Sequence, residues 1–106
     1  MVRELSTPAT PREVLAAIEA RLGRTEKVHE EYLSAGDAEA GIAVYEQYFT
    51  RVKNRIALMV IADDFAGSTS VRVITTGSSQ GLFFNLDWGA ASAYAAEAVE
   101  IISSLG

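Results

Sequence analysis

The sequence contains no cysteine and only one histidine among its 106 residues. Without cysteine, the chain can form no disulfide, no thiolate zinc site and no iron–sulfur cluster, and it has no cysteine nucleophile. A protein metal centre needs at least three converging ligands, and a single histidine contributes only one of them. We therefore expect no metal site and no cofactor, and we assign no catalytic residue.

Long hydrophobic runs and an excess of basic residues are also missing. The longest apolar run, residues 56–62, falls far short of the roughly 18 residues that span a bilayer. Lysine and arginine together number 9 against 14 acidic residues, and the net charge is −5. Nucleic acids and anionic membranes attract basic surfaces, so we expect neither as a partner. Residues 1–11 lack the apolar core of a signal peptide, which predicts a cytoplasmic protein.

The length and composition are those of one ordinary globular domain. On folding, a chain of this length buries roughly 65% of its unfolded surface, which is enough for a core without covalent cross-links. The hydrophobic fraction of 49% and the charged fraction of 22% are both typical of such domains. Polar residues and prolines near the start predict a flexible tail over residues 1–9. A single domain is then expected over residues 10–106.

Two helices are predicted, one near each end of the domain. The first has Thr10 as its N-cap, Pro11 at the first helical position, and Glu13 completing a T-x-x-E capping box. The second covers residues 88–104, with Asp87 as its N-cap. Each helix carries one stripe of apolar or small residues. These stripes are Val14, Ile18 and Leu22 in the first helix and Ala91, Ala95, Ala98 and Ile102 in the second.

Four strands are predicted between the helices, where β-branched and aromatic residues lie between turn signals. They cover residues 26–34, 39–50, 55–62 and 69–76, and residues 82–86 form either a short fifth strand or a packed connection. The turns are too short for parallel crossovers, so consecutive strands should pair antiparallel. The predicted fold class is α+β. We expect a two-layer sandwich, with a four- or five-stranded antiparallel sheet flanked by an N-terminal and a C-terminal helix on one face.

Gly77-x-Ser79-x-Gly81 has the letter pattern of a hydrolase nucleophile elbow. In an elbow, the serine lies on a turn from a strand to a helix and the histidine follows later in the chain. Here an apolar segment follows Ser79, and the histidine, His29, comes before Ser79 in the chain. Short patterns recur by chance, so we do not expect Ser79 to be a nucleophile. The glycines instead predict a loop with positive φ angles, whose amides leave anion binding open.

Aromatic and basic residues gather on or near the hairpin predicted from residues 39–50 and 55–62. The same region also holds Glu46, Gln47 and Arg51. Tyrosine and arginine are enriched at binding surfaces. We therefore predict a ligand-binding site formed by Tyr45, Tyr48, Arg55 and Gln80. The alternative is that Tyr45 and Tyr48, which have opposite parity in the strand, pack on different faces and share no site.

His29 supports a separate hypothesis, in which the protein is a small hydrolytic or isomerising enzyme. Alternation along the strand places Glu31 on the same face, so a histidine–carboxylate pair can form. The alternative interpretation is a solvated, charged strand, which is the usual environment of such residues.

Three motifs stand out between residues 44 and 89: V-Y-E-x-Y at residues 44–48, the N-R pair at residues 54 and 55, and G-x-x-Q-G-x-F-F at residues 77–84. With these motifs the chain resembles a family of small bacterial proteins of similar length that has no assigned function. The resemblance does not extend to the first 25 residues. It implies a single small domain and supplies no activity.

Three functional hypotheses follow from the sequence. The first is a non-enzymatic module that binds a partner or self-associates as a homodimer, because the strands are apolar on both parities. The second is a protein of the helix-grip kind, which holds a small molecule between the sheet and the two helices. The third is the enzyme that uses His29 and a carboxylate. A small-molecule or a protein ligand is compatible with the first two.

Overall fold

The computed structural model describes residues 1–76 and 85–106, with the backbone alone for residues 85–88. Within these residues, five strands and two helices follow in the order β1-α1-β2-β3-β4-β5-α2. The five strands form one antiparallel sheet in the order β1-β5-β4-β3-β2. The elements are β1 (Val2–Thr7), α1 (Pro11–Arg21), β2 (Glu26–Ala35), β3 (Ala38–Phe49), β4 (Asn54–Asp63), β5 (Thr69–Thr76) and α2 (Asn85–Ser103).

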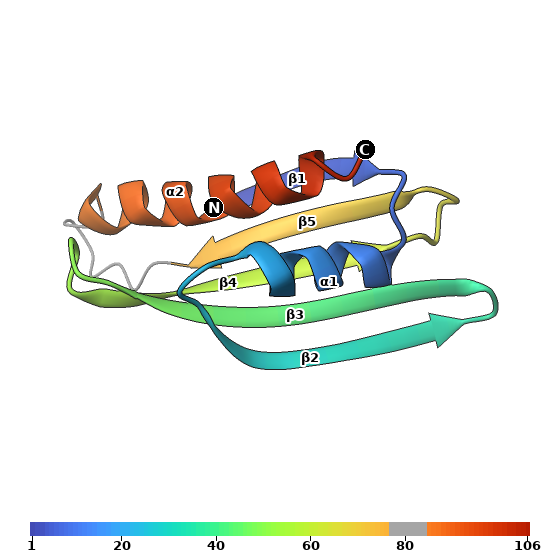
Figure 1. The fold of residues 1–106 in the computed structure, drawn as a ribbon, viewed down its shortest axis with the longest axis horizontal. Helices are drawn as coiled ribbons and strands as arrows, with labels where there is room; N and C mark the ends of the chain where they lie inside the picture. Colours follow the sequence, from blue (N-terminus) through green and yellow to red (C-terminus); the bar gives the residue numbers. More distant parts are fainter. Residues whose placement is uncertain (77–84) are drawn as a thin grey trace.

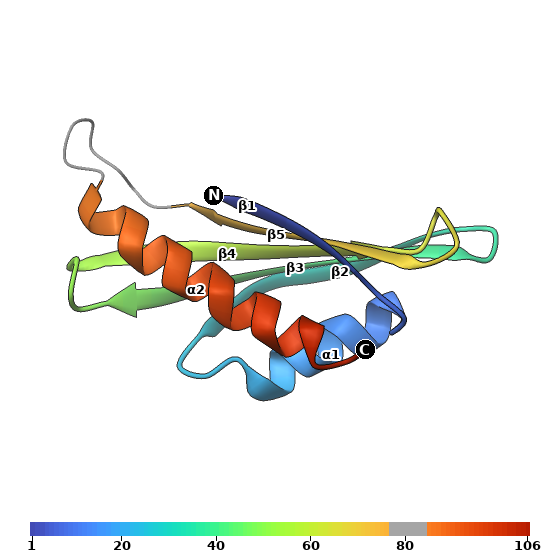
Figure 2. The same cartoon turned by 90° about the horizontal axis from the view of Figure 1, so that it is seen from above.

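The molecule has two layers, because both helices lie on the same face of the sheet (Figure 1 and Figure 2). The core fills the space between the layers and is built from alternate strand residues and one stripe of each helix. This arrangement confirms the predicted α+β two-layer sandwich. The largest fully buried side chains are Tyr45, Tyr94, Leu15, Ile18, Ile56, Leu58 and Ile102.

Helix α1 begins at the predicted capping box. The Thr10 hydroxyl accepts a hydrogen bond from the backbone N–H of Glu13 at 3.1 Å, and the Glu13 carboxylate accepts one from the N–H of Thr10 at 2.8 Å. The helix ends at the C-cap Leu22, whose N–H donates to the carbonyl of Ile18 at 2.9 Å. Caps of this kind stabilise a helix by about 1 kcal/mol.

Helix α2 begins at Asn85, before the predicted start at residue 88, so Asp87 lies inside the helix and is not its N-cap. Aspartate is favoured in the first turn of a helix as well as at the N-cap, so the residue type alone does not fix where the helix begins. The predicted small-residue stripe is confirmed, since Ala91, Ala95 and Ala98 are buried. This close packing lets the Thr75 hydroxyl on β5 donate to the carbonyl of Ala91 at 3.2 Å.

Residues 2–7 form strand β1, which corrects the predicted flexible tail over residues 1–9. β1 pairs with β5 from Val2 opposite Ile74 to Thr7 opposite Thr69. The charged residues Arg3 and Glu4 are adjacent and separate Val2 from Leu5, so the segment lacks the alternation of a strand and gives no strong local signal. Its structure comes from a partner strand far along the chain, which periodicity cannot reveal.

The fifth strand of the sheet is therefore β1. The other candidate was residues 82–86. Residues 82–84 lie outside the described residues, and Asn85 already belongs to α2.

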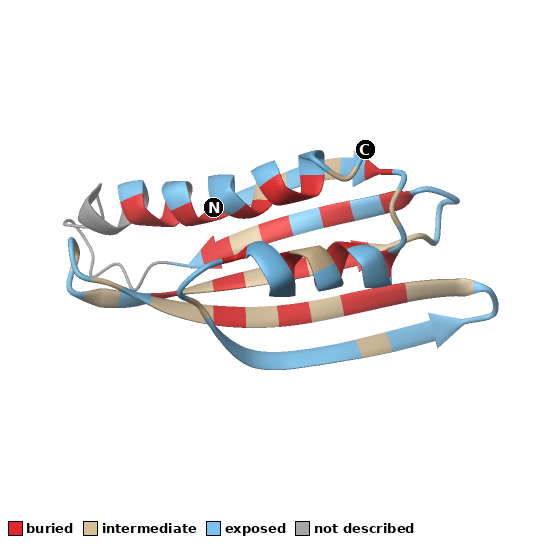
Figure 3. Ribbon diagram, in the orientation of Figure 1, coloured by how far each residue is buried: buried red, intermediate tan, exposed pale blue. Residues whose placement is uncertain are grey.

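The four strands predicted between the helices are confirmed to within one residue at each end. β4 lies at the centre of the sheet, and Figure 3 shows buried residues alternating along β3, β4 and β5. β2 is an edge strand and is exposed along nearly its whole length. Its charged side chains and the bulge between Lys27 and His29 are features that discourage pairing with another edge.

Candidate functional site

The face of the sheet opposite the helices is uncovered in the described part of the chain and is apolar at its centre. We call it the open face. Met59 lies at its middle, with Ile74 on one neighbouring strand and Val44 on the other. One step along the strands, Ile61 lies opposite Ile42. All of these side chains are half-buried. The apolar residues of the open face are Ala40, Ile42, Val44, Ala57, Met59, Ile61 and Ile74, with the exposed Val2 of β1 and Leu33 of β2 on the two edge strands.

Charged residues surround this apolar centre. At one end, Arg55 binds two carboxylates, Glu26 at 2.9 Å and Glu46 at 3.1 Å. Their hydrogen bonds and charges raise the pKa of Arg55, with Glu46 as the largest cause. On the β1 side, Glu4 lies directly opposite Arg72. The open face thus has an apolar centre and a polar rim, the usual composition of a protein interface.

Of the four predicted ligand-binding residues, two are neighbours and a third lies on the other face of the sheet. Tyr48 and Arg55 are neighbours across β3 and β4 and project on the open face. Tyr45 projects on the other face and is buried under the helices. Gln80 lies outside the described residues, as does the Gly77-x-Ser79-x-Gly81 pattern. The opposite parity of the two tyrosines therefore decides where their side chains lie, and ligand binding by Tyr48 or Arg55 stays a prediction.

Tyr45 is a core residue with a polar end. Its ring is 1% exposed, and its hydroxyl donates to the Glu19 carboxylate of α1 at 3.2 Å. Burial raises the pKa of Tyr45, and the nearby negative charge of Glu19 raises it further. The hydroxyl therefore stays neutral and links β3 to α1.

His29 and Glu31 form the pair that alternation predicts, with 2.7 Å between His29 Nε2 and Glu31 Oε1. The pair lies on edge strand β2, and about half of each side chain is exposed to solvent. Within the described residues, no three histidine or acidic side chains gather closely enough to hold a metal ion. The pair lies on a solvent-exposed edge strand, which fits the solvated-strand interpretation.

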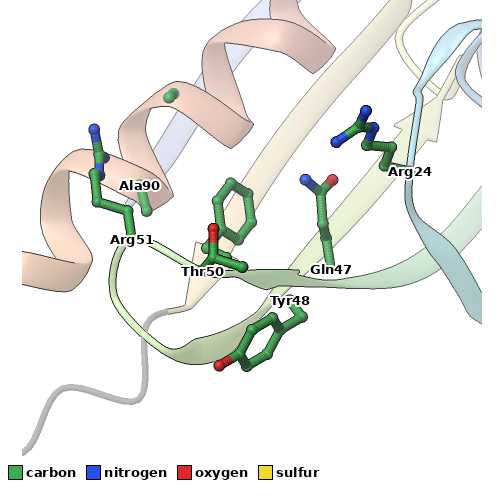
Figure 4. Close-up of a pocket in the computed structure, with 8 residues that line it drawn as sticks. Arg24, Gln47, Tyr48, Thr50, Arg51 and Ala90 are labelled. Carbon is green, nitrogen blue, oxygen red and sulfur yellow. The ribbon is translucent and has the colours of Figure 1, made fainter.

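A pocket of about 380 Å³ lies at the end of β3, between the loop that follows α1 and the first turns of α2. Figure 4 shows Gln47 on the α2 side of β3 and Tyr48 on the opposite side. The Gln47 Oε1 atom is buried, and no group in the described part of the chain donates a hydrogen bond to it. The pocket is lined by Arg24, Gln47, Tyr48, Phe49, Thr50, Arg51, Ala90 and Ala93.

Backbone features position the two arginines of this pocket. Arg24 has a φ of 56°, in the left-handed region that residues other than glycine rarely adopt. Arg51 lies against α2 at Gly89, where an added Cβ would be 3.2 Å from Arg51 Nη2. The glycine therefore leaves room for the guanidinium.

Gln47 and Arg51 lie on the hairpin that the sequence predicts, whereas Arg24 is not among the residues singled out by the sequence. The position of Gln47 in the strand was an available signal for an inward-facing polar side chain. Gln47 has the same parity as Tyr45 and Phe49, which face the helices, and it is the polar residue of these three. Arg24 carried no such signal, since only the tertiary structure brings the loop after α1 beside the end of β3. The helix-grip hypothesis stays a prediction: the pocket lies between β3 and α2, whereas the buried core cluster occupies the middle of the space between the two layers.

No helix in the described ranges has both the length and the apolar character needed to cross a membrane.

Comparisons with known proteins give a family and no activity. The search of curated proteins and the search of solved structures each found no match. The chain matches a family described as a family of unknown function, DUF6054, over residues 2–106, which is nearly its whole length. The protein therefore belongs to the DUF6054 family.

Proposed function

We propose that this protein is a non-enzymatic module that self-associates through the open face of its sheet. The observation that carries the proposal is the row of apolar side chains across the three central strands. An antiparallel sheet with one solvated face normally alternates apolar and polar residues. Here Val44, Met59 and Ile74 form a continuous apolar row where polar side chains are expected.

The size of the open face suits a second copy of the chain. Five strands spaced about 4.8 Å apart, with paired residues rising about 3.3 Å each, give a face of roughly 500 Å² per copy. The length of the face along the strands is that of the seven residue pairs that join β4 to β5. Two such faces in contact bury at least about 1,000 Å², because side chains add to the flat area, and that is the lower limit for a specific interface.

The shape of the open face also favours a second sheet over a small molecule. The pocket described above lies at the end of β3 beside α2, away from the apolar centre. Two twisted sheets pack face to face at about 10 Å with their side chains interdigitated. The half-buried side chains of Ile42, Ile61 and Met59 are the kind that such packing buries.

Substitution of Met59 by lysine tests the proposal. The side chain lies at the centre of the open face and outside the core cluster, so Met59→Lys should leave the fold intact. A lysine buried between two copies would lack a partner charge and prevent association. We expect sedimentation velocity to show a concentration-dependent dimer for the unmodified chain and a monomer for Met59→Lys.

The matched control is Ala96→Lys, which adds the same charge on the exposed side of α2. It should leave the dimer unchanged. A monomer at every concentration of the unmodified chain would contradict the proposal, as would a dimer that Met59→Lys leaves intact.

A further inference from the structure

We propose that the pocket at the end of β3 binds a small organic anion that carries a hydroxyl or amino group. This inference is independent of the open face, which lies on the other side of the sheet. It rests on four properties of the pocket: its two cationic side chains, its buried hydrogen-bond acceptor, its apolar wall, and the backbone conformation of Arg24.

The cationic side chains are Arg24 and Arg51, which border the pocket at its two ends (Figure 4). Neither guanidinium contacts a carboxylate within the described residues, whereas Arg12 and Arg55 both form ion pairs. In a chain of net charge −5, two unpaired arginines beside one pocket make a local positive site. Guanidinium groups recognise carboxylates and phosphates through paired, charge-assisted hydrogen bonds.

The buried acceptor is Gln47 Oε1. A buried polar atom normally has a partner, and leaving one unpaired is unfavourable. Gln47 projects from β3 toward α2 and lines the pocket, and its oxygen receives no donor from the described residues. An atom of this kind is satisfied by water or by a donor group on a ligand. The anion is therefore expected to carry a hydroxyl or an amino group.

Phe49, Ala90 and Ala93 form the apolar wall of the pocket. Most small-molecule sites combine such a wall with a few convergent polar groups and have volumes of about 300–1,000 Å³. The volume of about 380 Å³ lies at the lower end of that range. The ligand class is therefore a small anion with an apolar part, such as a hydroxy acid or a phosphate ester.

The conformation of Arg24 supports a binding role for its side chain. Its φ of 56° suits glycine, and Gly23 stands immediately before it. Strained backbone of this kind gathers at binding sites, where the side chain is needed more than local stability. Lys53 has a φ of 53° and also carries a positive charge, but it does not line the pocket. Lys53 therefore provides a control matched in both charge and conformation.

The test is to titrate the full chain with four small molecules and to measure their binding by NMR of the ¹⁵N-labelled protein and by calorimetry. The probes are 3-phenyllactate, which has a carboxylate, a hydroxyl and a ring; 3-phenylpropionate, which lacks the hydroxyl; 3-phenylpropanol, which lacks the charge; and glycerol 3-phosphate. We expect 3-phenyllactate or glycerol 3-phosphate to shift the Gln47 side-chain amide, and the stronger of the two identifies the anion. We expect 3-phenylpropionate to bind about 5–10-fold more weakly than 3-phenyllactate, and 3-phenylpropanol not to bind.

Arg24→Gly should weaken binding at least tenfold and leave Tm unchanged or higher, because glycine relieves the left-handed backbone. Lys53→Gly should have the same effect on Tm and leave binding unchanged. Gln47→Leu, which removes the unpaired acceptor, should retain the fold and also weaken binding. The proposal is overturned if no probe shifts the Gln47 amide at millimolar concentration. It is equally overturned if Arg24→Gly and Lys53→Gly weaken binding by the same factor, or if the neutral alcohol binds as well as the acids.

Discussion

Tyr45 illustrates how one side chain can be part of the core and still couple two elements. Its ring is buried among the strands and helices, and its hydroxyl reaches Glu19 on α1. A phenolate in this position would lose its hydration and face the negative carboxylate. Both effects raise the pKa of Tyr45, with burial as the larger cause. The folded state therefore binds the phenolic proton more tightly than the unfolded state does.

This difference predicts a loss of stability in alkali. An unfolded tyrosine ionises near pH 10, whereas folded Tyr45 stays protonated well above that value. The stability contributed by neutral Tyr45 is complete below pH 10 and is lost as the pH rises toward the folded pKa. Over that window the free energy of unfolding should fall by up to about 1.4 kcal/mol per pH unit through this residue.

Tyr45→Phe should remove this contribution. Urea unfolding at pH 8, 9.5 and 11 should show a shallower decline above pH 10 for the variant than for the unmodified chain. At pH 8 the variant should be about 1 kcal/mol less stable, because the hydrogen bond to Glu19 is lost. Parallel declines in the two proteins would contradict this account of Tyr45.

Helix α2 depends on small side chains to lie close to the sheet. Ala91, Ala95 and Ala98 face the core and are buried, and the Thr75 hydroxyl donates to the helix backbone at Ala91. The same helix contributes Tyr94, whose hydroxyl forms a hydrogen bond with the Thr25 hydroxyl at 2.5 Å and whose ring packs against Phe49 at a centroid distance of 5.3 Å. Burial is the largest cause that raises the pKa of Tyr94. Alanines thus set the helix-to-sheet distance, and Tyr94 fixes one end.

A pair of neighbouring alanines tests the importance of this close packing. Ala95→Leu should overpack the layer between α2 and the sheet and destabilise the protein by about 1–3 kcal/mol. Ala96→Leu places the same side chain on the exposed surface of the helix and should change stability by less than about 0.5 kcal/mol. Thermal unfolding followed by circular dichroism should separate the two variants. Equal losses would show that the small residues are not needed for packing.

At the scale of the whole molecule, strand β1 completes the sheet at one edge. β1 covers the edge of β5, and the N-terminal ammonium of Met1 donates to the carbonyl of Thr75 at 2.9 Å while the Thr75 N–H donates to the carbonyl of Met1. Hydrogen-bonded and non-hydrogen-bonded pairs alternate in an antiparallel ladder, so Arg3 and Leu5 also bond to β5. Glu4 then has its N–H directed away from β5. The N-terminal residues are therefore part of the sheet.

Deletion of residues 1–7 should lower the stability of the domain substantially. Ladder hydrogen bonds contribute about 0.5–1.5 kcal/mol each, so the loss should reach several kcal/mol and lower Tm by at least about 10 °C. The exposed β5 edge should also promote aggregation, which light scattering can follow. Glu4→Pro is the milder comparison, since it removes no bond to β5. An unchanged Tm after the deletion would mean that β1 is an accessory segment.

The sequence by itself determined the elements whose signals are local. The capping box at Thr10 and Glu13, the four strands between the helices and the alanine stripe of α2 all follow from residue type and spacing over a few positions. Their order and short turns also fixed the antiparallel sheet and the two-layer class. The tertiary structure alone decided that residues 2–7 form a strand and which parity of β3 faces the helices. It also decided that Arg24 lies beside Gln47 and Arg51. Each of these depends on contact between segments far apart in the chain, and local spacing carries no information about such contacts.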